Sequence, residues 1–198
     1  SLYEGSFNND AHWGGDNFLV FASAHIIQTQ KKQLAEHLIP KLLLAGIVPH
    51  YSDLVIAGQF HINADIIKAM FDAGRLRADT TLTHFGAKSS LLVMAVLSDN
   101  FDAAQLWLSL NSPVEPDHYM PNALDYLFHR QDKYSKEHLR ALSLAMLQKG
   151  ASPNHSQTQG KLIQILTESE REKYAGQLLP NNRIVLSQQE KAEVDSAL

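Results

Sequence analysis

The sequence predicts an all-α fold in which repeated helix pairs stack side by side as a helical solenoid. The first observation is a strong helix stop in residues 148–154, where Gly150 can take the left-handed conformation that closes a helix and Pro153 keeps the helix from resuming. The second is that apolar helical runs end on a comparable signal four times. The third is a mean spacing of roughly 35 residues, which is typical of a stacked repeat. In register, the stops fall at Gly46, Gly74, Pro113 and Gly150, with spacings of 28, 39 and 37 residues.

In the first half of the chain, the predicted helices cover residues 34–45, 54–58 and 64–73. The first carries leucines at the spacing of a buried helix face, and Asn63 is a suitable N-cap for the third. Residues 16–22 open with Asp-Asn before an apolar run, which favours the start of a further helix. Residues 80–86 contain three threonines and then a glycine, and they predict a hairpin-like finger.

In the second half, the predicted helices cover residues 91–97, 102–110, 122–129 and 137–149. Ser89 or Ser90 starts the first of them, and Pro121 fits the first turn of the third. The charged segment 130–136 is too long for a standard turn within a helix pair and predicts a loop insertion. Two further short helices are expected at 162–166 and 168–179.

The helix stops resemble those of the ankyrin-repeat family, whose second helix closes with a leucine pair, two polar residues and then Gly-Ala-Asp-Pro-Asn. Residues 150–154 read Gly-Ala-Ser-Pro-Asn. Residues 63–68 and 102–107 resemble the opening of the family's second helix. Residues 89–92 and 120–124 stand where the family has the Thr-Pro-Leu start of its first helix. The resemblance implies an ankyrin-like solenoid.

The chain also departs from the ankyrin pattern. No unit keeps the complete Thr-Pro-Leu-His motif, and Pro113 replaces the glycine of the third unit. The resemblance covers about residues 16–155. It divides the chain into an N-terminal lead-in or cap (1–15), ankyrin-like repeats (16–154; about 16–50, 51–79, 86–117 and 120–154), a degenerate capping repeat (155–180) and a polar tail (181–198).

Composition narrows the possible functions. The 198 residues are 44% hydrophobic, which is enough for a sizeable core. The net charge is −4, so general affinity for nucleic acid is not expected. There is no cysteine, no signal peptide and no apolar run of the roughly 20 residues that a membrane span needs. We therefore expect no membrane contact, a cytoplasmic location or secretion into a host cytosol, and, because residue 1 is not methionine, a piece of a longer protein.

The sequence contains no positive signal for catalysis. Ten histidines are present, but no His-x-x-x-His pair supplies the start of a helical metal site. A Gly-x-Ser-x-Gly elbow and a glycine-rich phosphate loop are also absent from the sequence. We expect no metal, no cofactor and no enzymatic activity in this chain, with any catalytic domain lying outside it.

The predicted finger residues are the candidate binding surface. Their mixed charge and aromatic content are typical of protein recognition. Trp107 is a further candidate, because its register places it on the outer side of the second helix, where an exposed tryptophan is a common interface anchor. For the tyrosines, packing between repeats is the alternative. For Trp107 the alternative is packing between repeats or covering the long loop 130–136. The candidate residues are His50, Tyr51, Asp53, Arg77, Asp79, Glu115, Asp117, His118 and Tyr119.

Protein–protein recognition is the function that the ankyrin resemblance implies, by a chain expected to be monomeric. Divergent repeats of this kind are similar to the C-terminal ankyrin domains of OspC/CopC-type arginine ADP-riboxanases, bacterial virulence effectors that recognise host caspases and use calmodulin. Two alternatives remain. One is a stand-alone scaffold or inhibitor, and the other is an enzyme or small-ligand binder on a divergent helical fold.

Overall fold

A computed structural model describes residues 32–84, 87–115 and 121–178, and the fold is all-α, as predicted. The described helices are α2 (Lys32–Leu44), α3 (Tyr51–Gln59), α4 (Ala64–Ala73), α5 (Leu91–Leu97), α6 (Phe101–Ser109), α7 (Ala123–His129), α8 (Lys136–Gln148), α9 (Ser156–Ile165), α10 (Glu168–Lys173) and α11 (Ala175–Leu178). A short 3-10 helix, η1 (Gln131–Lys133), lies between α7 and α8.

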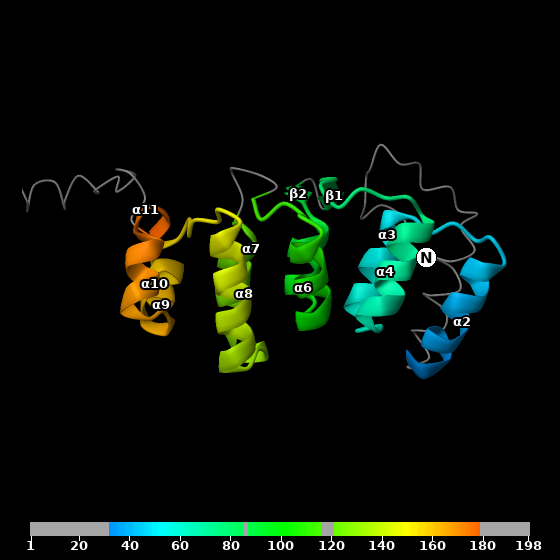
Figure 1. The fold of residues 1–198 in the computed structure, drawn as a ribbon, viewed down its shortest axis with the longest axis horizontal. Coiled ribbons are helices and arrows are strands. Elements are labelled where there is room, and N and C mark those ends of the chain that lie inside the picture. Colours follow the sequence, from blue (N-terminus) through cyan, green and yellow to red (C-terminus); the bar gives the residue numbers. More distant parts are fainter. Residues whose placement is uncertain (1–31, 85–86, 116–120, 179–198) are drawn as a thin grey trace, which may run out of the picture.

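The helices pack as pairs that stand side by side (Figure 1). Consecutive helices form the pairs α3 and α4, α5 and α6, and α7 and α8. First helices contact one another in the order α3, α5, α7, α9, and second helices in the order α2, α4, α6, α8. Helices α2 to α9 are therefore arranged in two layers, in which the helices of the three central pairs contact both their partner and equivalent helices of neighbouring pairs.

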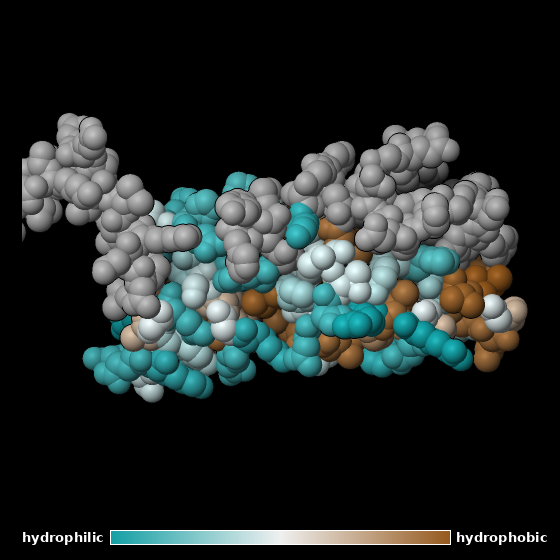
Figure 2. Space-filling view, turned by 90° about the horizontal axis from the view of Figure 1, so that it is seen from above, coloured by the Kyte–Doolittle hydropathy of each residue, from teal (hydrophilic) through white to brown (hydrophobic). Residues whose placement is uncertain are grey.

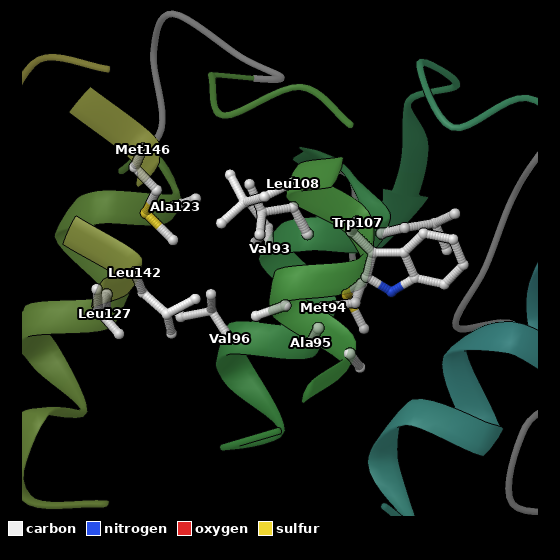
Figure 3. Packing of buried hydrophobic residues seen from close by; sticks show 14 of the residues in the cluster. Val93, Met94, Ala95, Val96, Trp107, Leu108, Ala123, Leu127, Leu142 and Met146 are labelled. Atoms are coloured by element: carbon white, nitrogen blue, oxygen red, sulfur yellow. The ribbon is translucent and has the colours of Figure 1, made fainter. Parts of the chain in front are cut away.

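The core lies between these two layers and is thickest around α5. Six consecutive residues from Leu91 to Val96 are buried, so α5 is covered on all sides. Such a uniformly apolar sequence has no polar face and is expected only for a fully buried helix. Val93 and Met94 lie beside Leu108 and Trp107 of α6, while Val96 faces Leu142 of α8 (Figure 3).

Side-chain caps fix where most of these helices begin. Asn63, Ser90, Asn100, Asn122, Ser135 and Thr167 each accept a hydrogen bond from a backbone N–H in the first turn. Each cap satisfies a donor that a helix N-terminus leaves unpaired. The predicted bounds of 64–73 and 91–97 are confirmed. Pro121 is a correction, because it precedes the N-cap Asn122 and lies outside the first turn.

The predicted helix stops prove to be one repeated backbone turn. Six described helices are followed by a residue with positive φ. In each case the next residue donates its N–H to the carbonyl five residues before it, with N···O distances of 2.9–3.3 Å. This is the Schellman turn, which pairs carbonyls that a helix C-terminus leaves free. The positive-φ residues are Gly46, His61, Arg75, Asp99, Asn111 and Gly150.

Two of the predicted stop positions need correction. Gly74 has a φ of −74°, and the left-handed residue is Arg75. In the third unit the turn falls on Asn111, two residues before Pro113. Asparagine tolerates the left-handed region better than most side chains, but arginine has no such advantage. The backbone turn recurs although its preferred residue does not.

The connections differ in length and form. Residues Leu82–His84 (β1) and Ala87–Ser89 (β2) pair antiparallel and confirm the hairpin-like finger; the turn at Gly86 lies outside the described residues. Between α7 and α8, the expected loop insertion is the compact η1 turn. Arg130, just before this turn, forms an ion pair with Asp99. The Tyr134 hydroxyl donates to the Val96 carbonyl at 3.0 Å, and its burial raises the pKa of Tyr134.

Replacing Gly150 with alanine tests the Schellman turn. Its φ of +88° is unfavourable for any residue with a Cβ, so Gly150→Ala is expected to lower the free energy of unfolding by about 1–2 kcal/mol. Gly160→Ala is the matched control, because Gly160 is exposed inside α9 and an added Cβ meets open space. That variant should gain about 0.5–1 kcal/mol from helix propensity. Urea unfolding measures both, and equal effects would contradict the turn assignment.

Candidate functional site

The chain passes from each pair to the next along one edge of the row (Figure 1). We call this the connection edge and define it by the described residues 45–50, 74–84, 87–90, 110–115 and 149–155. The first helix of each pair begins at this edge and the second helix ends there. The predicted finger residues that the structure describes, His50, Tyr51, Asp53, Arg77, Asp79 and Glu115, belong to this edge or to the helix turns beside it.

Tyr51, in the first turn of α3, is bonded to the finger that follows α4. Its hydroxyl accepts the Arg77 backbone N–H at 2.9 Å and lies 3.0 Å from the Arg77 carbonyl and 2.7 Å from Thr80 Oγ1. The ring is half-buried. One hydroxyl thus fixes both backbone groups of the residue at the base of the finger.

Ser90, the N-cap of α5, makes the equivalent bond one pair further along. Its hydroxyl donates to the Pro113 carbonyl at 2.7 Å and accepts the Val93 N–H at 3.2 Å. Ser112 completes the contact, because its Oγ accepts the Leu92 N–H at 3.2 Å. The start of α5 and the connection after α6 are therefore hydrogen-bonded to each other from both sides.

Asn122, the N-cap of α7, repeats the arrangement with a fully buried side chain. Its Nδ2 donates to the Ser152 carbonyl at 2.5 Å and to Glu115 Oε1 at 3.2 Å. Glu115 Oε1 also accepts the Ser152 N–H at 3.2 Å. Asp125 accepts the N–H groups of Asn154 and His155 at 3.2–3.3 Å. This connection is held by four side-chain contacts and is the most constrained of the three.

These bonds give three of the predicted binding residues a structural role. Tyr51 and Glu115 are half-buried and hold backbone, and Asp53 is fully buried. Asp53 Oδ2 accepts the His50 N–H at 2.8 Å as half of a capping box at the start of α3. These side chains position the connections. Asp53 is buried, so the expectation that it forms part of an exposed contact surface is wrong, while binding by Tyr51 and Glu115 stays a prediction.

The exposed part of the predicted site is the tip formed by Arg77 and Asp79, with His50 nearby in the preceding connection. The two side chains are 78% and 55% exposed and form an ion pair at 2.7 Å. The hydrogen bond between the two side chains lowers the pKa of Asp79 and raises the pKa of Arg77. Asp117, His118 and Tyr119 lie outside the described residues.

Trp107 is not on the surface. It is 2% exposed, and its ring and that of Phe71 pack edge to face with their centres 5.6 Å apart. The contact joins α6 to α4, so the tryptophan packs one second helix against the next. The expectation of a solvent-facing anchor is wrong, and the alternative of packing between repeats is confirmed.

Sequence reasoning missed an apolar surface on α2. Leu44 is 89% exposed, Val48 56% and Leu34 41%, and hydrophobic residues gather at this end of the molecule (Figure 2). The position of Leu44 relative to the helix stop could have revealed this surface. Leu44 lies two residues before the left-handed residue, and the same position in the other second helices is held by the exposed residues Ala73, Ser109 and Gln148.

A polar depression of about 740 Å³ lies open to solvent between the N-terminal ends of α2, α4 and α6. One of its carboxylates, Glu36, already accepts the Asn63 N–H at 2.8 Å. Within the described residues, no group of three or more His, Asp or Glu side chains is arranged to hold a metal ion. Nor does any helix in that part of the chain combine the length and apolar character of a membrane span.

Comparison with known proteins adds no identification. Neither a protein-family model, nor a curated protein, nor a solved structure matches this chain at a significant level.

Substituting Tyr51 tests whether it positions the finger. Tyr51→Phe removes only the hydroxyl and should lower the free energy of unfolding by about 1 kcal/mol, because the Arg77 N–H loses its partner. Amide hydrogen exchange at residues 77–80 should become faster in the folded state. Tyr126→Phe is the control, since its half-buried hydroxyl makes no hydrogen bond to a described residue. A variant with unchanged exchange at 77–80 would refute the positioning role.

Proposed function

We propose that this chain is a protein-recognition module, a helical solenoid of the ankyrin-repeat type that binds its partner along the connection edge. The observation that carries the proposal is the repeated bond from the start of a first helix to the following connection, made by Tyr51, Ser90 and Asn122. Ser90 and Asn122 are N-caps and Tyr51 follows one, and each bonds the residue two positions after a left-handed turn, so successive pairs are tied in a similar way. Repeats that are related in this way contact only their neighbours, which is the defining property of a solenoid.

The rigidity of the connections favours recognition of another protein. A loop that must be ordered on binding loses conformational entropy, whereas a loop already held by buried hydrogen bonds does not. The tip at Arg77 and Asp79 projects from such a base and remains exposed. Neighbouring helices in a packed array are about 8–10 Å apart, so successive connections present side chains at a regular spacing suited to an extended partner surface.

The division into four ankyrin-like repeats between atypical ends belongs to the same proposal. The two-layer packing of α2 to α9 supports it, as do the six equivalent Schellman turns. Attachment to a bacterial effector enzyme, with a host caspase or calmodulin as partner, stays a prediction from the sequence. The first experiment is therefore aimed at the binding surface and does not presuppose a partner.

A photo-crosslinking amino acid placed at residue 77 or 79 should capture a partner in cells that express the chain. The same group at Lys136, exposed at the start of α8 and therefore at the opposite edge of the row, should capture none. Arg77→Ala should then weaken binding of the captured protein by about 1 kcal/mol or more, with the melting temperature unchanged, because Arg77 is exposed. Adducts from Lys136 alone would place the interface elsewhere and overturn the proposal.

A further inference from the structure

The exposed apolar surface of α2 is unusual for its position in the helix pair. The equivalent residues of α4, α6 and α8 are alanine, serine and glutamine, which suits a solvent-facing position. Leu44 occupies that position with 89% of its surface exposed. Val48, four residues further along the chain and beyond the end of α2, is 56% exposed. Exposed apolar side chains gathered at one place mark a contact surface. We call Leu44, Val48 and the adjoining Lys41 the α2 end face.

We infer that residues 1–15 of this same chain dock on the α2 end face. The inference stands independently of the proposed function. It needs three conditions: the segment must reach the face, carry apolar side chains to cover it, and have a charge opposite to that of its rim.

Reach follows from the length of chain before α2. Residues 16–31 separate the segment from Lys32, the first described residue of α2. Such a connection extends to roughly 50 Å, which exceeds the length of α2.

Leu44 and Val48 lie at the end of α2 that reaches the connection edge, so the chain before α2 must span the length of that helix from Lys32. With 13 residues, α2 is about 20 Å long, well within the reach of residues 16–31. Residues 1–15 can therefore lie on the α2 end face.

Composition supplies the other two conditions. Residues 1–15 contain three aromatic residues, Tyr3, Phe7 and Trp13, which bury large apolar areas. Their charged residues are Glu4 and Asp10, and no lysine or arginine occurs among them. The rim of the α2 end face is basic, with Lys41 exposed and its Nζ 2.7 Å from His37 Nε2. A second copy of the chain fits less well, because antiparallel packing of two α2 helices would bring two Lys41 side chains together.

Tryptophan fluorescence tests this inference in the intact chain. Of the two tryptophans, Trp107 is buried, so acrylamide quenching reports mainly on Trp13. Docking predicts that Leu44→Asp increases the quenching constant of Trp13 several-fold. The matched control is Ala73→Asp, which adds the same charge at the equivalent exposed position of α4 and should leave quenching unchanged. Trp13→Phe should remove the quenchable signal.

Two results would overturn the inference. The first is a Trp13 that is quenched as strongly in the unmodified chain as in Leu44→Asp. The second is a dimer in sedimentation experiments that Leu44→Asp dissociates, which would make a second copy the occupant. Should Leu44→Asp fail to fold, deletion of residues 1–15 gives an independent readout. The deletion should increase binding of an apolar fluorescent dye, and Leu44→Gln in the deleted chain should reduce it again; no increase would contradict docking.

Discussion

A hydrogen bond from the start of the first helix to the connection after the same pair, present at α3, α5 and α7, is the constraint on which the described structure depends. It is made by a tyrosine hydroxyl at Tyr51, a serine hydroxyl at Ser90 and an amide at Asn122. At Ser90 and Asn122 the same side chain also caps its own helix, so one group fixes the start of a helix and the path of the chain about 23 or 30 residues later. Removing either side chain would leave buried backbone groups unpaired, at about 1–3 kcal/mol each.

This arrangement explains why the pairs keep one geometry although their sequences differ. The Schellman turn places the chain at the connection edge, the N-cap bond holds it there, and the apolar faces of α4, α5 and α6 then meet in register. Trp107 and Phe71 fill the space between two second helices that smaller residues fill elsewhere. The exposed Arg77–Asp79 tip is a consequence of the same bond, because Tyr51 holds the backbone from which it projects.

Local features were predictable from the sequence, and contacts between distant residues were not. The bounds of α4 and α5 follow from Asn63 and Ser90, whose capping chemistry acts within one turn. The orientation of Trp107 depends on the register of α6. The sequence pattern placed the helix stop at Pro113, two residues after the left-handed residue Asn111, and this shift turned Trp107 outward in the prediction. The bonds of Tyr51 and Glu115 were not predictable, because their partners, at Arg77 and Ser152, lie 26 and 37 residues away.

Native-state hydrogen exchange on Asn122→Ala tests the central claim that each pair is stabilised by its neighbours. We predict faster exchange in residues 149–155 and in α9, which lose the bond to Ser152, with α3 and α4 unchanged. Asn63→Ala is the control, since Asn63 caps α4 and its side chain makes no hydrogen bond to another pair in the described residues; its effect should stay within α4. Exchange that rises equally in α3, α4 and α9 of Asn122→Ala would mean one cooperative globule and would contradict the account.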